Sequence, residues 1–266
     1  MTMTSSPTSP RLPALRRLRV ALLAAGAALL AACGTADGGS PFEPTGPTGR
    51  VRFVNLITDT TRGRVNAILE SVPFGVNLTY TQTTPFSLPA PNNANYSAIY
   101  AGNRSLVLKR TADTNTVVAT IPFTVTASQD QTIYATGGTA ASAITSFVTT
   151  DDNTLSATQA RVRVVHLSPS AGAVDIFVTA PGDDLAAATP TLANVAVRTA
   201  SSYLAVNAGT YQVRVVPAGT APAQRAAAVA INVASLALSA NTVRTIVAAD
   251  NNVGGAPLRA FVLFDR

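Results

Sequence analysis

Apolar and polar residues alternate in short runs along most of the chain. Apolar residues occupy every second position at 174–178 and at 211–215, and the pairs Val195/Val197 and Leu106/Leu108 repeat this spacing. A period of two places alternate side chains on one face of a β-strand. Gly, Pro or Asn interrupts these runs about every eight to twelve residues, which is typical of short antiparallel strands in a β-sandwich. The pattern therefore predicts an all-β fold.

One segment departs from this pattern. Residues 224–238 contain a run of alanines, which are good helix formers. Because Val229, Ile231 and Val233 still alternate with smaller or polar residues, we predict a strand here rather than a helix.

The same pattern occurs twice in the chain. Residues 50–56 (RVRFVNL) align with residues 161–167 (RVRVVHL), an offset of 111 positions. Three further matches follow in the same order, with offsets between 107 and 114: 96–102 with 203–209, 132–135 with 245–248, and 147–148 with 261–262. These matches predict two homologous sandwich modules, at residues 50–152 and 160–266. The short connector between them is compatible with either a rigid or a hinged pair.

A local motif supports the sandwich. Residues 207–213 (NAGTYQV) resemble the tyrosine corner of immunoglobulin-like domains, in which the Tyr hydroxyl bonds a backbone group across the corner. The motif predicts this role for Tyr211. In the first copy Arg104 stands at the matching position, so that copy departs from the motif.

A family resemblance rests on residues 161–169 (RVRVVHLSP), Val174-Asp175, Tyr203-Leu204, the turn at residues 208–211 and the terminal pair Phe261-Val262. These residues resemble the family called domain of unknown function 4397. The resemblance covers nearly the whole second copy and, less closely, the first. It implies tandem antiparallel β-sandwich domains of the immunoglobulin/transthyretin-like kind, found in secreted bacterial proteins and lipoproteins. It implies no particular activity.

The N-terminal region has the features of an export signal. Arginines up to Arg19 precede eleven uncharged residues, 20–30, which are too few to cross a hydrocarbon core of ~30 Å. Residues 30–34 (LAACG) resemble the lipobox of bacterial lipoproteins, and Cys33 is the only cysteine of the chain. We therefore predict a lipoprotein signal peptide at residues 1–32 and lipidation, for example by palmitate, at Cys33. The alternative is a buried N-terminal helix with an incidental cysteine.

The predicted anchor leads to a location. Residues 34–49 are rich in Gly, Pro and Thr and have no periodicity, so residues 33–49 are expected to form the lipidated terminus and a flexible tether. The lipobox resemblance, with Gly34 after the cysteine, implies the bacterial cell envelope and specifically the outer membrane or cell surface. The partner expected from the anchor is the membrane, through the N-terminal lipid.

Charge argues against nucleic acid as a partner. The formal net charge of +6 falls to +2 once the four arginines before Val20 are removed with the leader. The remaining arginines are dispersed, which gives too weak a field for phosphate backbones. Arg50 with Arg52, and Arg161 with Arg163, alternate on one strand face, and we expect that face to point outward or to protect a sheet edge.

The candidate chemistry is sparse. One His and one Cys exclude a His-rich metal site, a Cys-X-X-Cys pair and a disulfide framework, and no nucleophile elbow or phosphate-binding loop is present. His166 matches Asn55 in the first copy, and because Asn is no general base we expect His166 to bond a turn carbonyl. The carboxylates at residues 151–152, 183–184 and 250 fall in predicted loops, where turn chemistry is favoured over calcium binding.

Aromatic residues give the remaining hint of function. Tyr80, Tyr96 and Tyr100 flank a polar, Pro- and Asn-rich stretch at residues 79–95. Exposed aromatic side chains on loops can stack on sugar rings, whereas the match of Tyr96 with Tyr203 indicates a core role for Tyr96. The candidate binding residues are Tyr80, Tyr100, Asp183 and Asp184.

Taken as a sequence, the chain is expected to be a non-catalytic, lipid-anchored envelope protein without a metal or cofactor. The expected role is a binding or interaction module for an envelope glycan or for another envelope protein. Two alternatives stay open: a purely structural spacer, and a hydrolase that uses loop carboxylates such as Asp151 or Asp183.

Overall fold

The computed structural model describes residues 46–84, 96–138 and 143–266. These residues form β-strands joined by loops and two 3₁₀ turns, η1 (Pro169–Ala171) and η2 (Pro222–Gln224), and residues Pro47–Arg266 make one compact unit. Cys33 and the predicted leader lie outside the described residues. No helix in the described part is long and apolar enough to cross a membrane.

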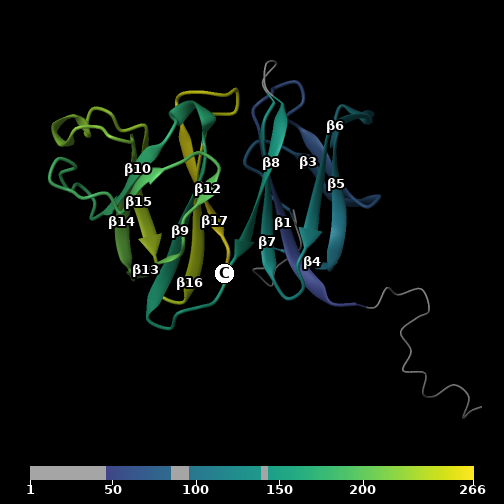
Figure 1. Ribbon diagram of the computed structural model, residues 1–266, viewed down its shortest axis with the longest axis horizontal. Helices are drawn as coiled ribbons and strands as arrows, with labels where there is room; N and C mark the ends of the chain where they lie inside the picture. Colours follow the sequence, from purple (N-terminus) through teal and green to yellow (C-terminus); the bar gives the residue numbers. More distant parts are fainter. Residues whose placement is uncertain (1–45, 85–95, 139–142) are drawn as a thin grey trace, which may run out of the picture. The chain divides into compact units, whose positions relative to one another are not determined.

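Each sequence repeat folds into two sheets (Figure 1). In the first repeat one sheet has the order β4-β1-β7-β8 and the other β3-β2-β5-β6. The bounds are β1 (Thr48–Ile57), β2 (Val65–Leu69), β3 (Val72–Leu78), β4 (Ser97–Tyr100), β5 (Gly102–Arg110), β6 (Asp113–Val125), β7 (Asp130–Gly137) and β8 (Ile144–Asp151).

The second repeat has the same order of corresponding strands. Its sheets are β12-β9-β16-β17, in which β13 also pairs with β9, and β11-β10-β14-β15. The bounds are β9 (Gln159–Leu167), β10 (Val174–Thr179), β11 (Leu192–Val195), β12 (Thr199–Ala200), β13 (Leu204–Asn207), β14 (Gly209–Pro217), β15 (Ile231–Leu238), β16 (Thr242–Ala249) and β17 (Arg259–Phe264). The all-β, tandem sandwich fold is therefore confirmed.

One strand pair in each repeat differs from the expected antiparallel arrangement. β1 pairs with β7 in parallel, and β9 pairs with β16 in parallel. Strands buried on both faces favour such pairs, and β1 is buried from Val51 to its end. Period-two alternation in a single strand carries no information about the direction of its partner.

Each repeat has its own apolar core between its two sheets. In the first, Val51 and Phe53 of β1 pack with Leu106 and Leu108 of β5. In the second, Val162 and Val164 of β9 pack with Val213 and Val215 of β14. Every second residue of each strand points inward, which is the alternation that the sequence shows.

A third apolar cluster joins the two repeats. It contains Val54 and Leu56 of β1, Val165 and Leu167 of β9, and Tyr134 of β7. These residues occupy the strand faces opposite to the sandwich cores. The two repeats therefore share buried surface, and the sheets that contain β1 and β9 are covered on both sides.

The structure confirms the predicted tyrosine corner and most, but not all, of the strand predicted in the alanine-rich segment. The Tyr211 hydroxyl donates to the carbonyl of Asn207 at 2.9 Å, as the tyrosine corner requires. Arg104 replaces it in the first repeat, because its Nε donates to the carbonyl of Tyr100 at 3.0 Å. In residues 224–238 the predicted strand is right from Ile231 onward, whereas Val229 precedes it and packs beside a small cluster around Phe177.

Candidate functional site

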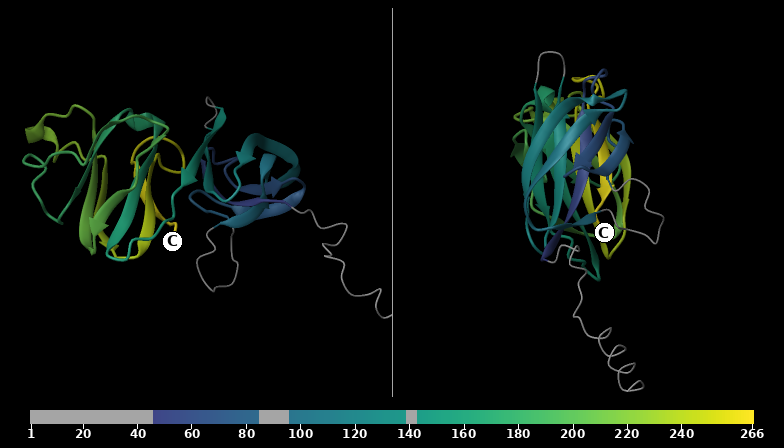
Figure 2. Two further views of the ribbon diagram at one scale, coloured as in Figure 1. Left: turned by 60° about the horizontal axis from the view of Figure 1, so that its bottom comes forward. Right: turned by 90° about the vertical axis from the view of Figure 1, so that its right-hand side faces the viewer.

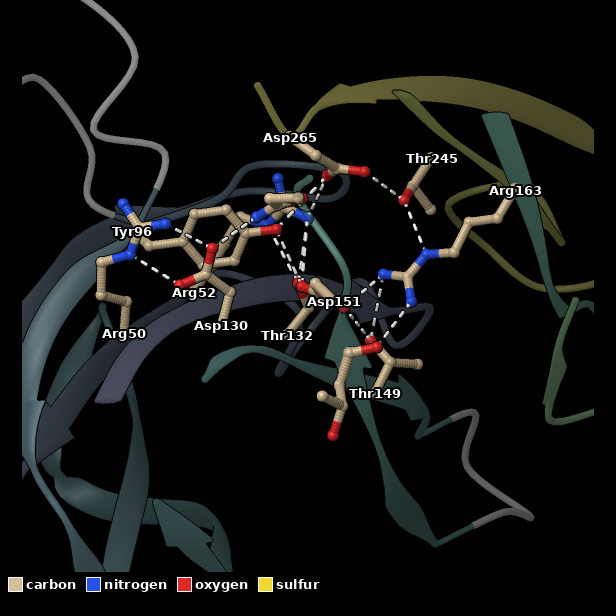
Figure 3. A network of polar contacts seen from close by, with 12 residues as sticks. Arg50, Arg52, Tyr96, Asp130, Thr132, Thr149, Asp151, Arg163, Thr245 and Asp265 are labelled. Carbon is tan, nitrogen blue, oxygen red and sulfur yellow. Dashed lines mark hydrogen bonds and ion pairs between the residues drawn. The ribbon is translucent and has the colours of Figure 1, made fainter. Parts of the chain in front are cut away.

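Two arginines expected on an outward face are instead buried between the repeats. Arg52 and Arg163 are each only 2% exposed. Arg52 Nη2 donates to a carboxylate oxygen of Asp265 at 2.6 Å, and Arg163 Nη2 donates to Asp151 (Figure 3). The expectation of an outward face is wrong for both, because the other repeat covers that face.

The contacts are reciprocal. The arginine of the first repeat pairs with an aspartate that follows β17, and the arginine of the second pairs with the aspartate that ends β8. Thr132 and Thr245 repeat the pattern, since each accepts a hydrogen bond from its arginine, at 2.9 and 2.8 Å, and each donates to an aspartate. The guanidinium groups of Arg52 and Arg163 lie 4.5 and 4.9 Å from the ring centroids of Tyr96 and Tyr203.

The two carboxylates of this buried network, those of Asp151 and Asp265, are held by protein donors. Asp151, placed by the sequence in a loop, ends β8 and accepts hydrogen bonds from Arg163, Thr132, Thr149 and Tyr96. Its two oxygens are therefore occupied by protein donors. Among the described residues, no three His, Cys, Asp or Glu side chains gather in a way that could hold a metal ion. The network joins the two repeats, because each buried arginine pairs with an aspartate of the other repeat.

The candidate site lies where the loops after β1 and β3 meet the β16–β17 loop. Figures 1 and 2 show this last loop, in yellow, beside the purple to blue loops of the first repeat. Tyr80 crosses from one repeat to the other, because its hydroxyl donates to the backbone carbonyl of Asp250. Its ring packs against the apolar cluster between the repeats. Burial raises the pKa of Tyr80, with Asp250 acting in the same direction and Arg259 against it.

Tyr80 lines two clefts, each of about 460 Å³, which together we call the Tyr80 groove. The first cleft is lined by Asp59, Arg64 and Thr81 from the first repeat and by Asn252 and Arg259 from the second. The second cleft is lined by Leu56 and Thr136 from the first repeat and by Leu167, Ser170 and Val253 from the second. Both clefts exist only because the repeats are joined.

Buried hydrogen bonds hold the loop from the second repeat in place. One Asp250 carboxylate oxygen accepts from the hydroxyls of Ser168 and Ser170, and the other accepts from the backbone N–H of Gly255. Asn251 closes the same loop through its contacts to Ala256 and Val253. The carboxylate of Asp250 thus helps to shape the groove.

The charges of the first cleft are not balanced within it. Asp59 is ion-paired with Arg62, whose Nε lies 2.6 Å from its carboxylate. Hydrogen bonds from Thr61, and to a smaller extent from Arg62, hold the pKa of Asp59 well below its ordinary value. The carboxylate of Asp59 therefore stays ionised and paired. The side chains of Arg64 and Arg259 have no hydrogen-bond or ion-pair partner among the described residues.

The four candidate binding residues do not converge. Tyr80 lines the groove, whereas Tyr100, 37% exposed, lines a separate cleft with Phe74, Ile99 and Arg104. Asp183 and Asp184 accept hydrogen bonds from the backbone N–H groups of Ala180 and Ala186, at 3.0 and 2.9 Å, and so stabilise their own loop. Nothing in the sequence pattern joins Arg64 to Arg259, because only the contact between the repeats brings them to one cleft.

His166 has the structural role that the sequence predicts. Its Nε2 lies 2.7 Å from the carbonyl of Gly172, which assigns the proton to Nε2. Its counterpart Asn55 donates to the carbonyl of Gly63 at 2.6 Å. Burial holds the pKa of His166 below its ordinary value, because a second proton would lie on the buried Nδ1, which has no acceptor.

Comparison with known proteins finds a family model that matches part of the chain. The family model described as Domain of unknown function (DUF4397) matches residues 49–177, which contain β1 to most of β10. The match thus covers the first repeat, although the sequence motifs were closer in the second. A solved structure of a leucine-rich repeat protein from Bacteroides thetaiotaomicron is similar at 13% identity with a TM-score of 0.19, over 75% of this chain and 26% of that one. The chain therefore spans about a quarter of that protein's length. No curated protein matches the chain.

Proposed function

We propose that the chain, whose residues 49–177 match the DUF4397 family model, is a non-catalytic binding protein of the bacterial cell envelope whose ligand site is the Tyr80 groove. The observation that carries the proposal is that both repeats line one groove. A spacer needs no such groove, and a hydrolase needs a carboxylate free to act. The carboxylates at the groove, Asp59 and Asp250, are held by protein donors.

The dimensions of the groove favour a glycan over a folded protein partner. Ligand pockets for small molecules have volumes of roughly 300–1,000 Å³, and each cleft lies in this range at about 460 Å³. Specific protein interfaces cover about 800 Å² on each partner and are flat by comparison. Tyr80 supplies an aromatic wall to both clefts, and Thr81 and Asn252 supply polar groups that suit sugar hydroxyls.

The anchor is part of the same proposal. Lipidation of Cys33 after cleavage of the leader would hold the protein at a bilayer, because two or more acyl chains give stable attachment. The segment at 34–49 would then act as a tether between the lipid and the sandwiches. Metabolic labelling with a palmitate analogue tests this: the full chain is expected to be labelled, and Cys33→Ala is expected to lose both the label and the membrane fraction. Labelling that survives Cys33→Ala would contradict it.

The binding role is tested by retention of the full chain on cell-wall fractions. Asn252→Trp places a large side chain in the first cleft from an exposed position, and Asn115→Trp is the matched control at an exposed position near the start of β6. Retention is expected for the unmodified protein and for Asn115→Trp, and loss is expected for Asn252→Trp. Absence of retention for the unmodified protein, or equal retention of both variants, would overturn the assignment. Retention by envelope proteins alone would assign a protein partner instead.

A further inference from the structure

The residues that join the repeats are duplicated, whereas those of the Tyr80 groove are not. Arg52, Thr132 and Asp151 have the counterparts Arg163, Thr245 and Asp265 in the same contacts. Corresponding backbone hydrogen bonds identify the counterparts of the groove residues. Thr81 donates to Asn55 as Arg198 donates to His166, which aligns Tyr80 with Val197.

The two arginines of the first cleft, Arg64 and Arg259, also have no arginine at the corresponding position of the other repeat. The carbonyl of Arg64 accepts from Thr111 at 3.0 Å, as that of Ala173 accepts from Ala218 at 2.9 Å, so Arg64 corresponds to Ala173. Arg259 lies opposite Ala249 on β16, and Thr145 lies opposite the matching position Thr136 on β7. The aromatic ring and both guanidinium groups therefore occur at only one end of an otherwise repetitive contact.

From these observations we infer that the first cleft of the Tyr80 groove binds an anionic group on a glycan, a carboxylate or a phosphate, between Arg64 of the first repeat and Arg259 of the second. The inference rests on the proposed function and specifies its ligand class. Guanidinium groups present a planar set of donors that matches carboxylate and phosphate oxygens.

Arg64 and Arg259 are available to bind an anion because neither is paired with a carboxylate of the first cleft. Asp59, the acidic residue of the first cleft, is already neutralised by Arg62. Asp250 lines the second cleft, and its oxygens are held by Ser168, Ser170 and Gly255. The residues that line the first cleft, with Arg64 and Arg259 against Asp59, therefore carry a net positive charge beside the Tyr80 ring. Thr60 and Thr79 add hydroxyl groups along the same wall, which suit the ring hydroxyls of a sugar.

The experiment measures affinity of the full chain, by isothermal titration calorimetry, for oligogalacturonate, phosphorylated dextran and neutral dextran of matched length. Arg64→Gln and Arg259→Gln each remove one cation, and Lys109→Gln is the control that removes one charge from β5. We expect either arginine variant to bind the anionic glycan about 10- to 100-fold more weakly, the range for a lost hydrogen bond to a charged group. Lys109→Gln should bind as the unmodified chain does.

The three ligands separate the sources of the anion. Binding of oligogalacturonate over phosphorylated dextran assigns a carboxylate, and the reverse preference assigns a phosphate. Equal binding of neutral dextran, no binding of either anionic glycan, or equal losses in Lys109→Gln and the arginine variants would overturn the inference. Retention on cell-wall fractions that Asn252→Trp abolishes but Arg64→Gln and Arg259→Gln leave unchanged would overturn it while the proposed function stands.

Discussion

Asp265→Asn tests whether the buried ion pairs hold the two repeats together. The Arg52–Asp265 pair has an N–O distance of 2.6 Å, and both side chains are at most 2% exposed. The substitution leaves the guanidinium group of Arg52 buried without its nearest counter-charge. Removing one partner of a buried pair costs about 3–5 kcal/mol of unfolding free energy. Asp151, at 3.8 Å from Arg52, remains as a weaker partner, so the lower end of this range, about 3 kcal/mol, is expected.

Urea unfolding followed by far-UV circular dichroism measures this loss, since the chain has no Trp to report by fluorescence. Glu70→Gln is the control, because Glu70 and its partner Arg104 are 49% and 21% exposed, and an exposed pair contributes about 1 kcal/mol or less. The double variant Arg52→Met/Asp265→Leu should lose less stability than Asp265→Asn, because it leaves no unpaired charge. Equal losses for Asp265→Asn and Glu70→Gln, or a larger loss for the double variant, would refute the reasoning.

Two further predictions concern single residues. Tyr211→Phe removes the bond to Asn207 and should lower the unfolding free energy in urea by about 1 kcal/mol, whereas Tyr100→Phe, whose hydroxyl makes no hydrogen bond within the described part of the chain, should lower it by less. Because burial holds the pKa of His166 below 6.5, the unfolded chain takes up a proton before the folded one as the pH falls. The stability advantage of neutral His166 is therefore present above pH 6.5 and declines below it, and urea titrations from pH 8 to pH 5 should show that His166→Asn lacks this decline.

One result would contradict each of these two predictions. Equal losses for Tyr211→Phe and Tyr100→Phe would remove the tyrosine corner as a source of stability. A pH dependence of unfolding that is the same for His166→Asn as for the unmodified chain would show that other groups cause the decline.

The repeat and the strand pattern were readable from the sequence because they are local. The alternation in residues 174–178 and 211–215 marks β10 and β14 directly. The offset between residues 50–56 and 161–167 likewise identifies β1 and β9 as counterparts. The tyrosine corner was also readable, because its hydrogen bond spans only four residues.

The contact between the repeats was misread, for a physical reason. Alternation shows that Arg50, Arg52, Val54 and Leu56 share one face of β1, but it does not show what covers that face. The arginines alone indicated solvent. Val54 and Leu56 on the same face were the overlooked signal, because a strand that is apolar on both faces is typically buried on both.

The groove could not be predicted from the sequence. Arg64 precedes β2 and Arg259 begins β17, and no local pattern relates them. They line one cleft because the network around Asp151 and Asp265 and the cluster around Val54 and Val165 fix one repeat against the other. Tyr80 was singled out as an aromatic loop residue, but its bond to Asp250 depends on the same contact.

The crossed pairing of Arg52 with Asp265 and of Arg163 with Asp151 has the form of a two-fold dimer interface, in which each half offers the other the same patch. Here both halves belong to one polypeptide, joined between Asp151 and Gln159. Two separate chains would come apart on dilution, whereas halves tethered in this way meet at a fixed effective concentration. A single copy of the molecule therefore keeps its halves assembled at any concentration. Fusion also frees the halves to diverge, so one end can acquire an arginine or a tyrosine that a dimer of identical chains would have to carry twice.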